Sequence, residues 1–170
     1  MKTCMFTGHR PQKLPFGFNE DDKRCIELKK RLTHLIREKI ENGFTHFITG
    51  MALGTDTFAA EIILFLRRVF PNISLEAIIP CSNQSSKWGK MQIRRYNSLL
   101  KQCDSVVILQ ENYTTDCMQK RNRFMVDKAD CVIAVWNGTY SGTGQTVKYA
   151  VNKKLPVTVL HPYTLAVLEF

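Results

Sequence analysis

Long apolar runs are missing from this sequence of 170 residues. No stretch approaches the roughly 18 to 20 consecutive apolar residues that a membrane-spanning helix needs. The first strand-like segment reaches a turn at Gly8, which is too early to supply the apolar core of a signal peptide. We therefore expect a cytoplasmic protein with no membrane partner.

Metal-binding cysteine patterns are missing as well. The six cysteines form no C-x-x-C pair, and no histidine lies at zinc-finger spacing from a pair of cysteines. A zinc site therefore has no support, and we expect neither a metal nor another cofactor. Cys4 and Cys131 lie in apolar, strand-like runs, where a thiol behaves as a small hydrophobic group. We expect reduced, structural thiols of the kind found in a reducing compartment.

Positive charge is in excess, with 24 Lys and Arg against 15 Asp and Glu and a net charge of +9. Such a balance favours anionic partners such as nucleotides, nucleic acids or acidic proteins. The basic residues are dispersed in short groups along predicted helices, where a solvated helix face explains most of them. Charge alone therefore does not favour nucleic acid as the partner.

Six short apolar runs alternate with five helical segments, and no repeat, low-complexity stretch or linker divides them. The runs predict strands at residues 3–7, 45–49, 74–79, 105–109, 131–136 and 156–160. Helices are predicted at 21–42, 56–69, 88–102, 118–129 and 143–153. Several runs are continuous rather than alternating, as is typical of strands covered on both faces. The order predicts a single α/β domain over residues 1–170, with a mostly parallel sheet of about six strands between helix layers.

Polar residues follow the first predicted strand as Thr7-Gly8-His9-Arg10. In a parallel sheet the carboxyl ends of the strands meet at one edge, where ligands bind. Gly8 allows a sharp turn and a close approach to a ligand. His9 and Arg10 add a proton carrier and an anion clamp, and both are candidate catalytic residues. A glycine turn with surface His and Arg is the simpler interpretation.

A second glycine turn, residues 49–56, joins the second strand to a helix. Gly50, Gly54 and Thr55 are expected to present backbone N–H groups to a phosphate at the helix N-terminus. The turn matches neither the G-x-G-x-x-G nor the Walker pattern. Asp56 has two interpretations, a helix cap or a ligand contact. Glu61 is a third candidate catalytic residue, and its sequence context does not decide which way it faces.

A third glycine turn, residues 137–146, follows the fifth strand and opens another helix. Glycines with hydroxyl residues between them are typical of an anion-binding turn, although a surface loop would have the same composition. Trp136 at the strand tip is expected to stack on a base or to pack in the core. The expected ligand contacts in this turn are Gly142, Thr143, Gly144 and Thr146.

The remaining candidates lie between these turns. The polar segment 82–86, followed by Trp88 and Arg95, is expected to form a loop or lid over the pocket. Arg121 and Asn122 stand early in the helix before the fifth strand, where they reach the pocket rim or simply begin an exposed helix.

Four ordered motifs carry a resemblance to a known family. They are TGHRP at residue 7, TGMALGTDTFAAE at residue 49, RNRFMVDKAD at residue 121 and SGTGQTVKYA at residue 141. Together they resemble the YpsA-like branch of the SLOG superfamily over roughly residues 3 to 160. The superfamily also contains the DNA-processing protein DprA (Smf) and the LOG cytokinin-activating enzymes. The resemblance implies a Rossmann-like fold and a nucleotide or nucleotide-derived ligand.

One departure from the LOG pattern bears on catalysis. LOG-type enzymes cleave the N-glycosidic bond of a nucleoside monophosphate and carry a glutamate after the P-G-G-x-G-T segment. In the corresponding segment, residues 141–146, no carboxylate follows, and Thr146 and its neighbours stand there instead. Glycosidic cleavage needs a carboxylate or an equivalent group. Asp56, Glu61 and Asp127 are the alternatives that the sequence offers.

Three functions follow in order of preference. The first is binding of a nucleotide or an ADP-ribose-like ligand at the strand carboxyl ends, with sensing as one use of such binding. The second is a LOG-like N-glycoside hydrolase or phosphoribohydrolase acting on a nucleoside monophosphate. The third is DprA-like binding of single-stranded DNA, although the chain lacks the row of exposed aromatics that strand binding usually uses. Such domains can form homo-oligomers, but no segment of the sequence marks an interface.

Overall fold

Seven strands form one sheet in the order β4-β3-β2-β1-β5-β6-β7, in a computed structural model that describes all residues 1–170. Every neighbouring pair is parallel except β6 and β7. The strands are β1 (Lys2–Gly8), β2 (Phe44–Thr49), β3 (Ser74–Ile79), β4 (Ser105–Ile108), β5 (Cys131–Val135), β6 (Val157–Leu160) and β7 (Val167–Glu169). The helices are η1 (Pro11–Lys13), α1 (Lys23–Glu41), α2 (Thr55–Leu66), α3 (Lys90–Leu100), α4 (Cys117–Lys128) and α5 (Gly142–Asn152).

Local sequence explains where the longest helix, α1, begins and ends. The Asp22 side chain accepts a hydrogen bond from the Arg24 backbone N–H at 2.8 Å, which caps the first turn. Gly43 follows the last turn with φ +85°, the left-handed conformation that ends many helices. The buried stripe of α1 recurs at helical spacing and consists of Cys25, Leu28, Leu32, Leu35 and Ile36.

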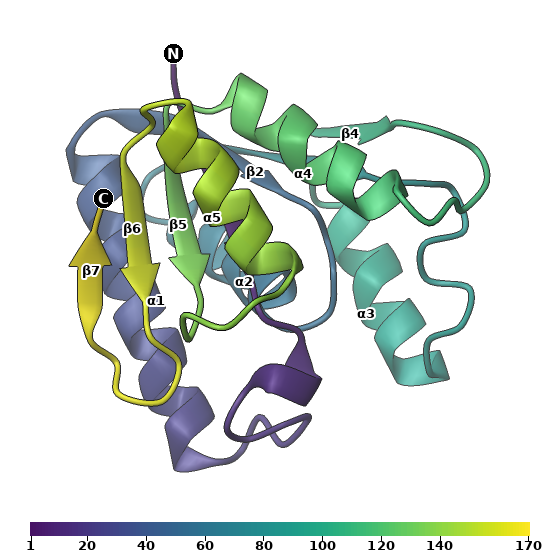
Figure 1. Cartoon of the computed structure of the whole chain (residues 1–170), viewed down its shortest axis with the longest axis horizontal. Helices are drawn as coiled ribbons and strands as arrows, with labels where there is room; N and C mark the ends of the chain where they lie inside the picture. The colour runs from purple at the N-terminus through teal and green to yellow at the C-terminus, as the bar shows by residue number, and fades with distance from the viewer.

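Helices cover both faces of the sheet. Side chains of α1, α2 and α3 pack with Phe6 and Phe47 in one buried cluster. Side chains of α4 and α5 pack with Met5 and Ile48 in a second cluster on the opposite face. Figure 1 shows this arrangement, with α4 and α5 in front of the sheet and α1 behind it. Neighbouring residues of β1 therefore enter different cores, which explains why its apolar run is continuous.

Strand order places a switch point beside β1. From β1 the chain adds β2, β3 and β4 outward on one side, and then crosses back to add β5 on the other side. The connections that leave β1 and β5 therefore diverge to opposite faces of the sheet. This divergence opens a crevice at the carboxyl ends of the two strands.

The predicted α/β class, the helix layers and the mostly parallel sheet are confirmed. All six predicted strands and all five predicted helices are present, with bounds that shift by a few residues. The expected strand number is corrected from about six to seven, because β7 joins the edge of the sheet antiparallel to β6. No helix of the chain combines the length and apolar character required to cross a bilayer.

Candidate functional site

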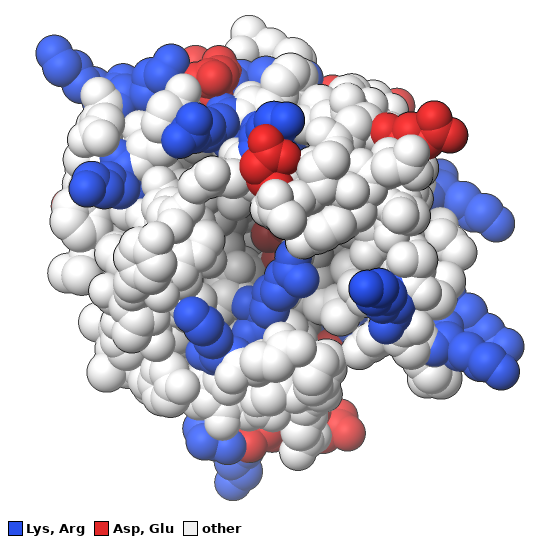
Figure 2. All heavy atoms as spheres, turned by 45° about the vertical axis from the view of Figure 1, so that its right-hand side comes forward, with Lys and Arg blue, Asp and Glu red and all other residues white.

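A cavity of about 290 Å³ opens at the carboxyl end of β1, between the first turns of α2 and α5 and the side of α4. Figure 2 shows a hollow on this side of the molecule, with Lys or Arg atoms running across it and an acidic group inside. Nine of the predicted ligand residues line the cavity: Thr7, Gly8, His9, Arg10, Asp56, Arg121, Asn122, Gly142 and Thr143. Four segments distant in sequence therefore meet at one site, and three of them lie at the ends of strands, where the sequence predicted a shared pocket.

The junction of β1 with α2 explains two of the glycines. A Cβ on Gly8 would overlap the Thr55 side chain, and one on Gly54 would lie 2.8 Å from the His9 carbonyl oxygen. Gly54 also has φ +88°, which a side chain rarely tolerates. Thr55 donates to the His9 carbonyl from its backbone N–H at 3.3 Å and from its hydroxyl at 3.1 Å. Gly54 and Thr55 thus fasten α2 to β1, and they lie outside the cavity.

Arg121 is buried in the cavity wall, with 4% of its surface exposed. Its guanidinium donates to the Gly50 carbonyl and, from Nε, to Asn122 Oδ1 at 2.8 Å. A Cβ on Gly50 would overlap this guanidinium, so glycine is needed there to admit the arginine. Burial lowers the pKa of Arg121, and the nearby Asp56 carboxylate opposes that shift. Gly50 therefore supports the site from behind and does not line it.

Asp56 supplies the only carboxylate on the cavity wall. It is buried in the first turn of α2, and its Oδ2 accepts a hydrogen bond from the Ala52 backbone N–H at 3.2 Å. Burial raises the pKa of Asp56, while the charges of Arg121 and Arg10 act in the opposite direction. The helix-cap interpretation is wrong, because Gly54 is the N-cap of α2 and Asp56 instead binds the Ala52 amide before the helix. The ligand contact stays a prediction for a side chain that lines the cavity.

His9 is buried and tied to the loop after β5. Its ring Nε2 lies 2.7 Å from Asn137 Oδ1 and 3.2 Å from the Asn137 backbone nitrogen, and the His9 backbone N–H donates to the Val135 carbonyl at 3.0 Å. Burial lowers the pKa of His9, and its hydrogen bond to Asn137 opposes the shift. The hydrogen bond to Asn137 joins β1 to the loop after β5, which gives His9 a structural role.

The first turn of α5 offers free donors to the cavity. The Ser141 side chain caps the helix by accepting from the Gly144 N–H at 3.1 Å, and the Gln145 N–H makes the first backbone bond of the helix. The N–H groups of Gly142 and Thr143 have no partner within the protein. These two donors stand at the positive end of the helix, where an anion is stabilised.

Two cationic side chains at the rim, Arg10 and Lys13, add to the positive electrostatic potential of the cavity. Arg10 is exposed and makes no ion pair, and its guanidinium touches only Met118 Sδ at 3.8 Å. Lys13 on η1 is exposed as well, and it also makes no ion pair. With Arg121 in the wall, three cationic side chains face one carboxylate, that of Asp56. The cavity is therefore suited to an anion.

Several predicted residues lie elsewhere. Arg95 and Glu61 pair with each other at 2.6 Å, and Arg95 also binds Glu20, on the face of the molecule where α3 meets α2. Glu61 therefore does not reach the cavity and is set aside as its catalytic residue. The predicted contacts outside the cavity are Gly50, Gly54, Thr55, Arg95, Trp136, Gly144 and Thr146.

The last three of these residues stabilise the loop before α5. Trp136 donates from Nε1 to the Thr139 carbonyl at 2.8 Å, and a Cβ on Gly144 would lie 3.0 Å from its ring. The Thr146 hydroxyl donates to the Gly142 carbonyl at 2.9 Å. Trp136 thus packs beneath its own loop and does not offer a stacking surface to this cavity.

Sequence reasoning missed six wall residues: Phe6, Gln12, Lys13, Ala52, Met118 and Ser141. Ser141 had a usable signal, since a serine before Gly142 at a helix start is a typical N-cap. Gln12, Lys13 and Met118 had none, because only the folding of η1 and α4 against β1 brings them to the cavity. No group of three His, Cys, Asp or Glu side chains is arranged to hold a metal ion.

Comparison with known proteins places these features in a family. The YpsA family, described as the YspA SLOG family, matches residues 4–170. A UPF0398 protein of Bacillus licheniformis is 28% identical over 145 residues, which cover 84% of this chain and 79% of that protein. The SPbeta prophage-derived protein YoqJ of Bacillus subtilis is 32% identical over 139 residues, which cover 74% of this chain and 81% of that protein.

Two solved structures share the fold. DNA processing protein A from Helicobacter pylori, described with a single-stranded DNA binding mode, aligns with a TM-score of 0.64 at 19% identity and covers 94% of this chain. DNA processing protein A from Streptococcus pneumoniae aligns with a TM-score of 0.62 at 17% identity. This chain covers 65% and 50% of those two chains, which is less than two thirds of either. The likeness shows the Rossmann-like fold that the motifs implied.

Proposed function

The chain belongs to the YspA SLOG family, and on that premise we propose that it binds the phosphate of a nucleotide or nucleotide-derived ligand in the cavity beside β1. One observation carries the proposal: the free N–H groups of Gly142 and Thr143 and the unpaired Arg10 border the same cavity. Backbone donors at a helix N-terminus, together with a guanidinium, form a recurring phosphate site. Sensing of such a ligand is one use of this binding.

Calorimetric titration tests the proposal. AMP, ADP-ribose, NAD and a cyclic nucleotide are titrated into the protein, and we expect at least one to bind with a dissociation constant below 1 mM, on the order of 4 kcal/mol or more of binding free energy. Inorganic phosphate serves as the reference for the phosphate group alone. Absence of binding by all four nucleotides at millimolar concentration contradicts the proposal.

A second candidate function is hydrolysis of an N-glycosidic bond, and the position of Asp56 favours it. This carboxylate faces the cavity, and burial raises its pKa, as a general acid or base near neutral pH requires. The test is release of free base from a nucleoside monophosphate by the wild type and by Asp56→Asn. Glu61→Gln is the control, because Glu61 pairs with Arg95 outside the cavity. Turnover that survives Asp56→Asn removes the assignment.

Binding of single-stranded DNA is a third candidate, favoured by the fold shared with DNA processing protein A and by the net charge of +9. A strand that contacts several phosphates releases bound counterions, so its affinity falls steeply as salt rises. Binding of a labelled oligonucleotide at low and high salt measures this dependence. Weak binding that does not depend on salt speaks against this function.

A further inference from the structure

A second cavity of about 460 Å³ adjoins the first. The two share Arg10 and Met118 as a common wall, so Arg10 stands between them. Loops after β3 and β4 form the rest of the second cavity, which includes Trp88 and Tyr113. A ligand that begins at the first turn of α5 can thus continue past Arg10 into this second cavity, which we call the loop groove.

Hydrogen bonds join the segments that form the floor of the loop groove. The two loops are joined because the Ser82 N–H donates to the carbonyls of Gln110 and Glu111 at 3.2 and 3.1 Å. Gln84 is buried and donates from its side-chain amide to the Gly50 carbonyl at 3.2 Å. The Gly50 carbonyl also accepts a hydrogen bond from Arg121. Gln84 in the groove and Arg121 in the wall of the first cavity therefore donate to the same oxygen.

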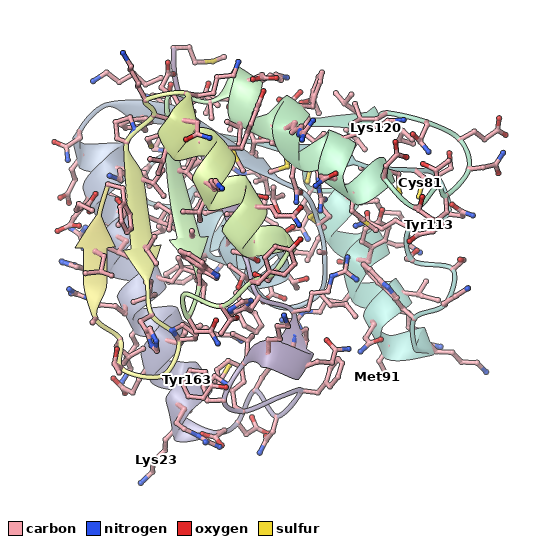
Figure 3. All side chains as sticks on the ribbon, in the orientation of Figure 1. Lys23, Cys81, Met91, Tyr113, Lys120 and Tyr163 are labelled. Atoms are coloured by element: carbon pink, nitrogen blue, oxygen red, sulfur yellow. The ribbon has the colours of Figure 1, made fainter.

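Aromatic rings border the groove. Trp88 packs edge-on against Tyr96, with ring centroids 5.3 Å apart, which fixes the position of its ring. Tyr113 is 58% exposed and makes no side-chain hydrogen bond. Figure 3 shows Tyr113 and Cys81 at the same end of the molecule, beside α3 and the first turn of α4. The Tyr113 ring is therefore open to a planar partner.

The polar groups of the groove are mostly neutral. Its wall contains no carboxylate and two cations, Lys87 and the shared Arg10. It also contains the side chains of Asn83 and Ser86, which make no hydrogen bond within the protein. An aromatic ring with free amide and hydroxyl groups nearby suits a nucleobase, which needs a stacking surface and partners for its edge. The first cavity differs in offering the free helix amides of Gly142 and Thr143 and the carboxylate of Asp56, and the two cavities share the cation Arg10.

We infer that the loop groove is a nucleobase subsite. A nucleotide then lies with its phosphate at the N–H groups of Gly142 and Thr143, its sugar beside Arg10 and its base against Tyr113. This inference rests on the proposed function and adds where the base is held and by which residues. The nucleobase subsite would also give a role to the polar segment 82–86, which the sequence predicted to form a loop or lid over the pocket.

Calorimetry with two ligands tests the subsite. AMP carries a phosphate, a ribose and a base, whereas ribose 5-phosphate carries the phosphate and the sugar without a base. Base stacking is worth roughly 1–3 kcal/mol by alanine substitution, so we expect Tyr113→Ala to weaken AMP binding by about fivefold or more. Ribose 5-phosphate should bind the variant and the wild type equally. Tyr113→Phe, which keeps the ring, should bind AMP like the wild type. Asn83→Ala should weaken the binding of AMP and leave the binding of ribose 5-phosphate unchanged.

The outcomes separate the two claims. AMP binding that Tyr113→Ala and Asn83→Ala both leave unchanged overturns the nucleobase subsite, while ribose 5-phosphate binding by the wild type keeps the proposed phosphate site. An equal loss for AMP and ribose 5-phosphate in Tyr113→Ala also overturns the subsite. A wild type that binds neither ligand overturns both claims.

Discussion

At the scale of single residues, two arginines serve the cavity in different ways. Arg121 is buried and bound to the Gly50 carbonyl and to Asn122, so its charge and its hydrogen bonds hold the wall together. Arg10 is exposed, makes no ion pair and stands between the two cavities. We therefore expect Arg10 to contact the ligand directly and Arg121 to keep the cavity in shape.

Replacement of Arg10 should reduce binding and leave the fold intact. A hydrogen bond to a charged group contributes roughly 1.5–3 kcal/mol, so Arg10→Ala should weaken AMP by about tenfold or more. Its melting temperature should match that of the wild type, because the side chain has no ion pair to lose. Lys23→Ala is the control, since Lys23 extends away from the body of the molecule (Figure 3) and lines neither cavity. Equal affinity of both variants contradicts this role.

His9 should make stability depend on pH. Burial lowers its pKa in the folded protein, so between that pKa and about 6.5 the unfolded chain binds more protons. The contribution of His9 to the free energy of unfolding should therefore be complete above pH 6.5. It should decrease as the pH drops toward the pKa of His9 in the folded protein. Urea unfolding at pH 7.5 and 5.5 measures the effect. His9→Gln should show a smaller difference, and an identical difference would count against burial as the cause.

The sequence located some site residues and misplaced others for a physical reason. Thr7, Gly8 and Arg10 could be predicted because they end β1 or lie just after it, and the sheet edge fixes where they lie. Arg95 and Glu61 could not, because their mutual ion pair depends on how α3 packs beside α2. Position along a strand is thus readable from sequence, whereas pairing between helices is not.

At the scale of elements, the glycine turns differ in what they do. Gly50 admits the Arg121 guanidinium, whereas a Cβ on Gly142 would meet nothing within 4 Å. Both turns looked alike in the sequence, as glycines between a strand and a helix. The turn after β2 admits the buried Arg121, and the turn at α5 places the free N–H groups of Gly142 and Thr143 at the cavity.

The two turns can be compared by the same substitution. Gly50→Ala should destabilise the protein by about 1–3 kcal/mol through overpacking, which lowers the melting temperature by several degrees. Gly142→Ala should leave the melting temperature unchanged and weaken phosphate binding, because its methyl group would stand at the cavity wall. Thermal unfolding and titration with AMP measure the two effects. A Gly50→Ala variant that melts at the wild-type temperature would contradict this division of roles. A Gly142→Ala variant that binds AMP with wild-type affinity would also contradict it.

At the scale of the whole molecule, strand order creates the site. The continuous apolar runs of β1, β3 and β5 could be read as strands covered on both faces, and helix layers cover them in the structure. Strand β7 could not be anticipated, because it has only three residues and depends on pairing with β6. The order β2-β1-β5 was not predicted either, yet it sets the crevice.

The net charge of +9 should have little influence on nucleotide binding. Its charges are dispersed, and a mononucleotide would meet only those around the cavity. Raising NaCl from 50 to 200 mM should therefore weaken AMP by less than about tenfold, whereas a protein with 6–10 phosphate contacts loses roughly 10³- to 10⁵-fold over that range. Parallel titrations with AMP and with an oligonucleotide give both slopes. A steep slope for the oligonucleotide, with affinity above that of AMP, would favour the DNA-binding function.

The most direct test of the central claim observes the two free amides themselves. In a ¹⁵N–¹H NMR titration with AMP, we predict saturable shifts of the backbone amide signals of Gly142 and Thr143, because the phosphate should accept hydrogen bonds from both. The Gly144 amide, already bound to Ser141, should move less and serves as an internal control. If AMP binds and leaves the Gly142 and Thr143 amides unmoved, or if no amide shifts at millimolar AMP, the phosphate site is not where we place it.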